Sequence, residues 1–243
     1  MGLLLFIQTL KRDKYNDFRK LYYFCGMQEG QNYIKELLRN ELLKPLPGFD
    51  YQRIMLPKSR LNDIAKIPKD VKKGAVLILL YKELERLMTA FIERTDDGGV
   101  HSRQISFPGG KYEKSDKDLF QTALREAKEE VGIEISQVTI LGNLSTLYIP
   151  VSNFTVFPII GYYTGIPTFV PNPLEVADII TVPVADLIDE NNRGIGTVDV
   201  RGTQFEVPVF KAGKYQIWGA TAMILSEFVQ VLKNANGVIK SKI

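Results

Sequence analysis

Three glutamates, Glu126, Glu129 and Glu130, are the residues whose type and spacing most clearly indicate chemistry. At positions i, i+3 and i+4 of a helix, their carboxylates project from one patch about a turn long. Such like charges repel, by roughly 0.2–0.5 kcal/mol per pair on an exposed helix. A hard cation such as Mg²⁺ or Mn²⁺ relieves the repulsion, and Mg²⁺ usually completes its shell with substrate phosphate oxygens. The triplet therefore indicates a metal site for a phosphate substrate, and a solvated acidic face balanced by Arg125 and Lys128 is the alternative.

A strongly patterned helix, expected at about 116–131, must position these glutamates. Its ends carry boundary signals: Ser115 and Asp118 form a capping-box pattern, and Gly132 is suited to the C-cap. Gly109 and Gly110 precede the helix and would let the backbone approach the site without interference from a Cβ atom. The apolar stripe comprises Phe120, Ala123, Leu124, Ala127 and Val131. The glutamates and Arg125 lie off this stripe, so one face is predicted to pack and the other to stay charged.

The rest of the chain interleaves strands with a few helices. We expect helices at 32–44, 184–191 and 219–232. We expect strands at 74–82 and 87–93, joined as a hairpin by the charged turn 83–86, and further strands at 138–148, 153–164, 179–182 and within 196–209. This order predicts an α/β (α+β) fold, an α/β sandwich around a mixed sheet.

Composition limits the class of protein. The 243 residues are 45% hydrophobic and 24% charged, so the chain can bury a sizeable core in one domain, which we place at 31–243. The longest apolar run, Ala75 to Tyr81, is too short to span a membrane. A net charge of +3 is too small for a nucleic-acid binder that acts by counterion release. The lone Cys25 permits no internal disulfide, which favours a reducing, cytoplasmic location.

The two ends of the chain carry weak targeting features. The apolar segment 2–7 has no preceding basic residue and turns polar at Gln8, so we do not expect secretion. Residues 1–30 are assigned as an N-terminal extension of uncertain order. The C-terminal Ser241-Lys242-Ile243 differs by one residue from the Ser-Lys-Leu peroxisomal signal, which leaves peroxisomal targeting as an alternative location.

The central helix and its approach resemble a known signature. Gly110, Asp116 and the run Arg125 to Ile133 are similar to the Nudix box, Gly-x5-Glu-x7-Arg-Glu-U-x-Glu-Glu-x-Gly-U, of enzymes that cleave nucleoside diphosphates linked to another moiety. Asp116 replaces the first Glu, and one extra residue precedes Arg125. Both departures are shared with the coenzyme A pyrophosphatase subgroup. The resemblance, which covers roughly 33–232, implies a Nudix-type α/β/α sandwich with a mixed sheet.

The resemblance also implies roles for individual residues. Glu126, Glu129 and Glu130 would bind Mg²⁺ or Mn²⁺, and one of them would double as general base. Arg125 would orient a carboxylate of the patch or Asp116. Glu175, in a segment similar to the family's Asn-Pro-x-Glu-Val, would be an extra ligand or the base, with an ordinary exposed loop acid as the alternative.

A second pattern of the subgroup lies upstream, where Phe91 to Thr95 and Phe107 to Gly110 fall in register with it. Its second Arg and its lone Gly fall on Gly99 and Arg103, which leaves the coenzyme A preference open. Candidate cations for the 3′-phosphate of coenzyme A are Arg94, Arg103, Lys111 and Lys114, with Arg94 the best single choice. His101 lacks the nucleophile elbow of a hydrolase triad and is set aside.

The expected activity is metal-dependent hydrolysis of coenzyme A or its derivatives to adenosine 3′,5′-bisphosphate and 4′-phosphopantetheine. The alternatives are a Nudix enzyme for ADP-ribose, NADH or an oxidised dNTP, a catalytically silent nucleotide sensor, and a scaffold whose acidic helix is a partner surface. The expected partner is a small nucleotide, without nucleic acid or membrane. A homodimer through the N-terminal helix is also open.

Overall fold

The computed structural model of the chain describes residues 28–57, 68–96, 103–200 and 202–241. Its helices are α3 (Gln28–Leu42), α4 (Phe49–Gln52), α5 (Leu119–Val131), α6 (Val184–Ile188) and α7 (Gly219–Ser241), with 3₁₀ turns η1 (Arg53–Met55), η3 (Ile135–Gln137) and η4 (Glu190–Asn192). Its strands are β1 (Lys72–Glu83), β2 (Arg86–Arg94), β3 (Ile105–Ser106), β4 (Gly109–Lys111), β5 (Val138–Asn143), β6 (Leu147–Ile149), β7 (Phe154–Tyr163), β8 (Val176–Pro183), β9 (Arg193–Val200), β10 (Thr203–Ala212) and β11 (Tyr215–Ile217).

The main sheet is mixed. Its order is β3-β2-β1-β7-β5, with β4 paired to β1, β6 to β7 and β8 to β2. Strands β1 and β7 run parallel, with Gly74 opposite Val156, whereas β1 pairs antiparallel with β2 and with β4. The β1–β2 hairpin turns at Leu84, whose φ is +52°. The predicted hairpin and mixed sheet are therefore confirmed.

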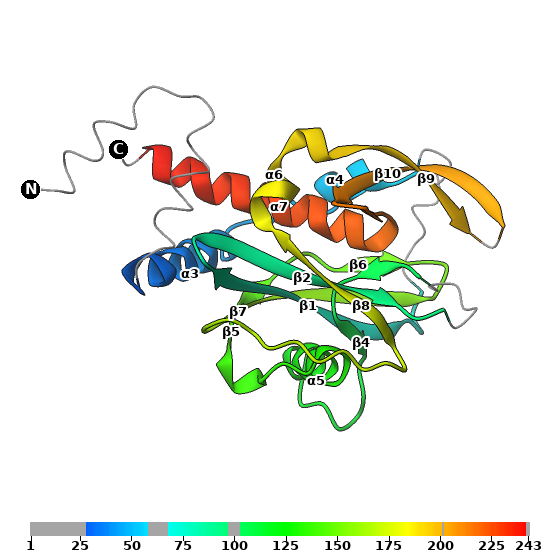
Figure 1. The fold of residues 1–243 in the computed structure, drawn as a ribbon, viewed down its shortest axis with the longest axis horizontal. Helices are drawn as coiled ribbons and strands as arrows, with labels where there is room; N and C mark the ends of the chain where they lie inside the picture. The colour runs from blue at the N-terminus through cyan, green and yellow to red at the C-terminus, as the bar shows by residue number, and fades with distance from the viewer. Residues whose placement is uncertain (1–27, 58–67, 97–102, 201, 242–243) are drawn as a thin grey trace, which may run out of the picture.

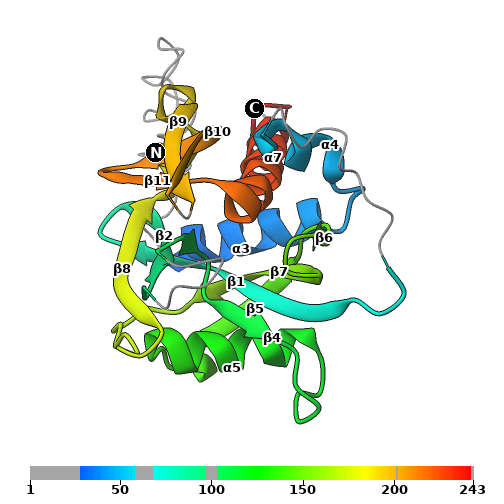
Figure 2. The ribbon, with the colours of Figure 1, turned by 90° about the vertical axis from the view of Figure 1, so that its right-hand side faces the viewer.

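Helices cover both faces of this sheet, and the alternation of β1 explains why. Because successive side chains of a strand point to opposite faces, Leu77 and Leu79 pack with Ala123 and Ala127 of α5. On the other face, Ile78 and Leu80 join a larger core that contains residues of α3, α6 and α7. Figures 1 and 2 show α5 on one side of the sheet and α7 on the other. The expected α/β/α sandwich is confirmed.

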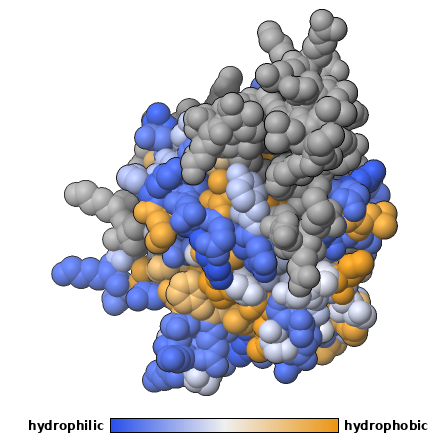
Figure 3. All heavy atoms as spheres, turned by 90° about the vertical axis from the view of Figure 1, so that its left-hand side faces the viewer, coloured by the Kyte–Doolittle hydropathy of each residue, from blue (hydrophilic) through white to orange (hydrophobic). Residues whose placement is uncertain are grey.

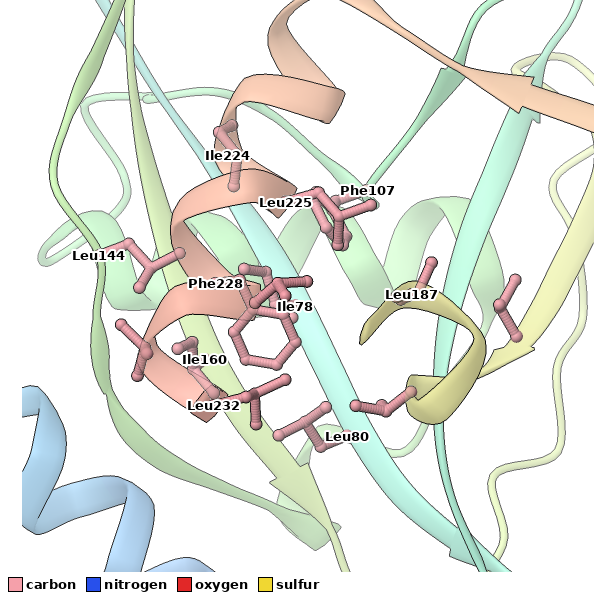
Figure 4. Packing of buried hydrophobic residues seen from close by; sticks show 14 of the residues in the cluster. Ile78, Leu80, Phe107, Leu144, Ile160, Leu187, Ile224, Leu225, Phe228 and Leu232 are labelled. Carbon is pink, nitrogen blue, oxygen red and sulfur yellow. The ribbon is translucent and has the colours of Figure 1, made fainter. Parts of the chain in front are cut away.

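The larger core lies between the sheet and α7. Figure 4 shows Phe228 and Leu232 of α7 beside Ile78, Leu80 and Ile160 of the strands. Phe228 and Leu80 are both fully buried, and burying such a side chain stabilises the fold by about 1.5–3 kcal/mol. The predicted docking helix is therefore present, and it continues to Ser241 instead of ending at residue 232.

A second sheet, of order β11-β10-β9, lies next to α7. The sequence predicted strands within 196–209 but gave no sign that they leave the main sheet. A small cluster of Val198, Val207 and Val209, with Trp218 packed against it, holds this sheet together. The side of the molecule in Figure 3 mixes hydrophilic and hydrophobic side chains over its described surface, as most folded proteins do.

Two further predicted boundaries are wrong, for local reasons. The central helix begins at Leu119, not near residue 116, because Asp116 is a buried hydrogen-bond acceptor ahead of the helix and Asp118 is the N-cap. The strand expected at 138–148 is two strands, β5 and β6. Between them the backbone of Ser145 bonds Glu227 and Gln52 instead of a neighbouring strand, because its N–H donates to Glu227 Oε1 (3.2 Å) and its carbonyl accepts from Gln52 Nε2 (3.1 Å).

Several expectations concern residues outside the described ranges. These include residues 1–27 of the assigned extension, together with Gly99, His101, Lys242 and Ile243. Helix α3 begins at Gln28, close to the start that the sequence indicated for the domain. The division at residue 30 stays a prediction.

Candidate active site

Helix α5 is fixed at both ends as its sequence requires. Asp118 Oδ1 accepts from the N–H of Gln121 (2.9 Å), and the side chain of Gln121 accepts from the N–H of Lys117 (2.7 Å). At the other end, Gly132 takes φ +69° and its N–H reaches the carbonyl of Lys128. The predicted C-cap Gly132 is confirmed. The predicted capping box is wrong, because Asp118 itself is the N-cap and the hydroxyl of Ser115 faces Glu113 (3.5 Å).

Arg125 links the acidic residues around the start of α5. Its guanidinium contacts Asp116 (Nε to Oδ1, 2.9 Å), Glu126 (Nη2 to Oε1, 3.0 Å) and Glu129 (Nη1 to Oε2, 3.0 Å). It also donates to the backbone carbonyl of Lys111 (3.0 Å). Arg125 therefore pairs with Asp116 and with the glutamate patch at once, which matches an orienting group.

Asp116 is the buried anchor of this network. It accepts from the hydroxyl of Thr122 (2.9 Å) and the N–H of Glu113 (3.0 Å) in addition to Arg125. The hydrogen bonds from Arg125 hold the pKa of the Asp116 carboxyl well below its usual range. A charged, fully bonded aspartate before the helix therefore fixes Arg125, whose other nitrogens are left for the glutamates.

Glu130 differs from the expectation. It was placed on the charged face, yet it is only 1% exposed, because its carboxylate passes under the loop before β4 and accepts from the N–H of Gly109 (Oε2, 2.8 Å). Arg94 lies beside it (Nη1 to Oε1, 3.5 Å). Burial, reinforced by the charges of Glu126 and Glu175, raises the pKa of Glu130 to about 7 against the opposing effects of Gly109 and Arg94.

The prediction for Phe120 is wrong in the opposite sense to that for Glu130. Phe120 was expected on the packed stripe, but 38% of it is exposed, whereas Ala123, Ala127 and Val131 are buried. Residue spacing locates a helix face only to within about one residue on each side. The predicted stripe therefore included the exposed Phe120 and left out the buried Glu130. Phe120 lies with Leu124 and Ile135 in a groove of about 690 Å³ along α5.

The glycines before α5 allow close approach. A Cβ on Gly110 would collide with the carboxylate of Glu126, and one on Gly109 would collide with the backbone of β1 at Ala75. Gly109 also has φ +154°, which disfavours other residues. Burial raises the pKa of Glu126, opposed by Arg125 and reinforced by the charges of Glu129 and Glu175. The absence of a side chain at Gly110 thus leaves room for one of the three patch carboxylates.

The loop that carries Glu175 closes over the end of α5. The N–H groups of Val170 and Asn172 donate to the carbonyls of Val131 and Glu130 (both 2.9 Å). Because the N–H of Asn172 binds the carbonyl of Glu130 three residues before Glu175, the fold brings this exposed acid near the glutamate patch, and its charge raises the pKa values of Glu126 and Glu130. The distance along the chain between Glu175 and the glutamates of α5 did not predict this proximity.

The two arginines expected to contact substrate have different surroundings. Arg94 is one-third exposed and is directed at Glu130. Arg103 is 72% exposed and makes only a long contact with Asp96 (3.9 Å). Its φ of +56° is a conformation that glycine favours, and the lone Gly of the upstream pattern falls at this position. Because Arg103 occupies the position of the pattern's glycine, an arginine must adopt this left-handed backbone conformation.

The donor set suits a hard cation, although its side chains face arginines here. Within the described ranges, no three His, Cys, Asp or Glu side chains are grouped as around a metal ion. Glu126 and Glu129 point at Arg125 and Glu130 at Arg94. Their oxygen ligands and mutual repulsion fit Mg²⁺ or Mn²⁺ after the exposed carboxylate of Glu129 turns. The metal and catalytic roles of these residues stay predictions.

The sequence did not predict the residues that support the site through hydrogen bonds. Thr122 bonds Asp116, and Thr95 bonds the Glu175 loop. Single threonines carry no periodic or spacing signal, so only their partners in the fold reveal them. Across the described residues, no helix is long and apolar enough to cross a membrane.

Comparisons with known proteins agree with the box. A NUDIX domain model matches residues 71–196, just over half of the chain. Human mitochondrial coenzyme A diphosphatase NUDT8 is 36% identical over 138 residues, which are 55% of this chain and 58% of that protein. An uncharacterized Nudix hydrolase NudL of Photorhabdus laumondii is 36% identical over 130 residues, 54% of this chain and 69% of that one.

Nudix hydrolase 15, mitochondrial, of Arabidopsis thaliana is 33% identical over 179 residues, 68% of this chain and 61% of that one. The chain thus spans about three-fifths of the length of the human and Arabidopsis proteins. A crystal structure of a C. elegans Ap4A hydrolase binary complex superposes with a TM-score of 0.46 at 17% identity, over 68% of this chain and 99% of that one. The domain match shows that the chain belongs to the Nudix family.

Proposed function

We propose that this chain is a metal-dependent pyrophosphohydrolase that cleaves coenzyme A or its derivatives into adenosine 3′,5′-bisphosphate and 4′-phosphopantetheine. The observation that carries the proposal is the gathering of Glu126, Glu129 and Glu130 on α5 beside the Gly109–Gly110 backbone. The coenzyme A diphosphatase named among the relatives supports this substrate.

Glu126, Glu129 and Glu130 would hold the Mg²⁺ or Mn²⁺ ion. When bound, the ion supplies positive charge against the diphosphate and stabilises the charge that develops on its oxygens. Glu129 is about half exposed and free to turn from Arg125, whereas Glu130 is held in place by Gly109. We therefore assign Glu130 as the fixed ligand and Glu129 as the adjustable one.

The remaining roles follow from position. Arg125, bound to buried Asp116, orients Glu126 and Glu129 and does not need to contact substrate. Glu175 approaches the patch from a separate loop, which suits a base that removes a proton from the attacking water. Glu129 and Glu130 stay alternatives for that base. Gly109 and Gly110 let β4 lie close to β1 and to the carboxylate of Glu126.

The 3′-phosphate of coenzyme A requires a cation near the site. Arg94 is directed at Glu130, so Arg103 is the more accessible cation for a substrate phosphate. The engagement of Arg94 favours the runner-up, a Nudix pyrophosphatase for a nucleotide without a 3′-phosphate, such as ADP-ribose. A silent sensor is disfavoured, because ligand binding alone does not require three repelling glutamates.

Turnover assays distinguish these functions. Purified protein is incubated with coenzyme A, dephospho-coenzyme A, ADP-ribose, NADH and oxidised dGTP, with Mg²⁺, Mn²⁺ or chelator. We expect metal-dependent release of adenosine 3′,5′-bisphosphate from coenzyme A. Robust ADP-ribose hydrolysis without coenzyme A turnover would assign the runner-up, and binding without turnover of any substrate would assign the sensor.

The expected cytoplasmic location, the absence of nucleic-acid and membrane partners, and the homodimer stay predictions. The names of the relatives include mitochondrial forms, and that of another Arabidopsis relative is chloroplastic. Fractionation of cells that express the tagged chain would test the location, and light scattering would test the oligomeric state.

A further inference from the structure

The Glu175 loop is held at its two ends by different parts of the fold. At its start, the backbone of Val170 and Asn172 bonds the last carbonyls of α5. At its end, the residue after β2 holds it: the N–H of Thr95 donates to the carbonyl of Glu175 (3.1 Å) and the hydroxyl of Thr95 to the carbonyl of Leu174 (3.2 Å). The loop therefore bridges the metal-binding helix and the strand that carries Arg94.

Inside the loop, Asn172 maintains a tight turn. Its side-chain oxygen accepts from the N–H of Leu174 (3.1 Å), and its carbonyl accepts from Glu175 and Val176 (3.0 and 2.8 Å). The side chain of Glu175 receives only a long contact from Asn172 Nδ2 (3.4 Å). The turn thus fixes the shape of the loop but leaves its angle relative to α5 to the contacts at the two ends.

We propose that Thr95 is a positioning residue that sets the Glu175 carboxylate toward the glutamate patch, through its hydroxyl bond to Leu174. This inference rests on the proposed function of Glu175. The pairing of Val176 with Arg94 and the bond from the Thr95 N–H to Glu175 hold the backbone where β8 begins. The hydroxyl of Thr95 adds a bond one residue earlier, at Leu174, and so restrains the backbone on the loop side of Glu175.

Thr95→Val tests the bond, because valine keeps the β-branched shape and loses the hydroxyl. We expect kcat to fall about fivefold, as for the loss of one hydrogen bond, with KM and the melting temperature unchanged. Thr95→Ser should retain kcat. Thr197→Val, the same change at an exposed position of β9, is the matched control. Amide hydrogen exchange at Glu175 and Val176 should quicken in Thr95→Val alone.

A double-mutant cycle separates positioning from a general structural role. In the Glu175→Gln background, Thr95→Val should cause no further loss of kcat. An equal loss in both backgrounds, or an unchanged kcat in Thr95→Val, would overturn the proposal. If Glu175→Gln is silent while Glu130→Gln abolishes turnover, the positioning role fails and the proposed function stands. If Glu130→Gln is silent too, the proposed function itself fails.

Discussion

Helices α5 and α7 cover opposite faces of the sheet and each carries a buried glutamate, and the two carboxylates have different surroundings. Glu227 of α7 is fully buried and accepts from the N–H groups of Gly48 (3.1 Å) and Ser145 (3.2 Å) and from Gln52 Nε2 (2.8 Å). Glu130 of α5 is equally hidden but accepts one N–H, from Gly109, and has an arginine at 3.5 Å.

The difference separates a carboxylate whose charge is well satisfied by hydrogen bonds from one whose charge is not. Through hydrogen bonds from these three donors, Glu227 attaches α7 to α4 and to two loops. Glu130 has fewer donors and neighbouring negative charges, so its charge is poorly satisfied and its pKa lies near 7. Burial with incomplete hydrogen bonding is more typical of functional carboxylates than burial alone, which supports the metal-ligand role proposed for Glu130.

The largest expected effect is on turnover. Glu130→Gln and Glu129→Gln should each lower kcat by on the order of 100- to 1,000-fold, because each removes one charge of the proposed metal site. Both proteins should stay folded, and slightly more stable in chelator, since repulsion is relieved. Steady-state assays and thermal melts measure this. Glu36→Gln, on the surface of α3, is the control, and unchanged turnover in both site variants refutes the ligand assignment.

Glu227→Ala should act on stability instead. It removes the acceptor of the partly buried N–H groups of Gly48 and Ser145, whereas Gln52 Nε2 keeps the carbonyl of Ser145, so the free energy of unfolding should fall by about 1–3 kcal/mol. Urea denaturation gives this value. Glu227→Gln, which keeps an oxygen acceptor, should cost less. Activity per folded molecule should be retained in both variants. A loss of kcat without a loss of stability would contradict the structural role of Glu227 and its contrast with Glu130.

Stability of the metal-free protein should depend on pH through Glu130. Its folded pKa is raised from 4.5 to about 7, so the folded state binds the proton more tightly. The resulting stability is complete below about pH 4.5 and is lost as the pH rises to about 7, a change of about 3 kcal/mol. Asp116 has the opposite sign, because its lowered pKa adds stability that is lost in acid.

Urea denaturation in chelator at several pH values, for the wild type and Glu130→Gln, isolates this contribution. The difference between the two curves should shrink as the pH falls below 5. Parallel curves from pH 4.5 to 7 would show that the charge of Glu130 is better compensated than its contacts indicate.

Divalent ions should produce the smallest effect. Mg²⁺ or Mn²⁺ at about 100 times its dissociation constant should stabilise the protein by roughly 2.7 kcal/mol. The shift in melting temperature should disappear in Glu126→Gln and persist in Glu227→Gln. Equal shifts in the two variants would place the ion away from the α5 patch.

Much of the α5 region was predictable because its signals are local. These signals lie within one stretch of chain, which contains Gly109 and Gly110, the spaced glutamates and the cap residues Asp118 and Gly132. The β1–β2 hairpin was predictable for the same reason. The split between β5 and β6 was not, because it depends on Glu227, which is 82 residues from Ser145.

The sequence by itself determined that three carboxylates share one helix face, since helical geometry turns spacing into direction. Only the tertiary structure decided which of them is buried, since that depends on Gly109, 21 residues away, and on Arg94 from another strand. It likewise decided that Thr95 holds the Glu175 loop. Spacing fixes neighbours along a helix, whereas burial and pairing between segments arise only when the sheet and its covering layers pack together.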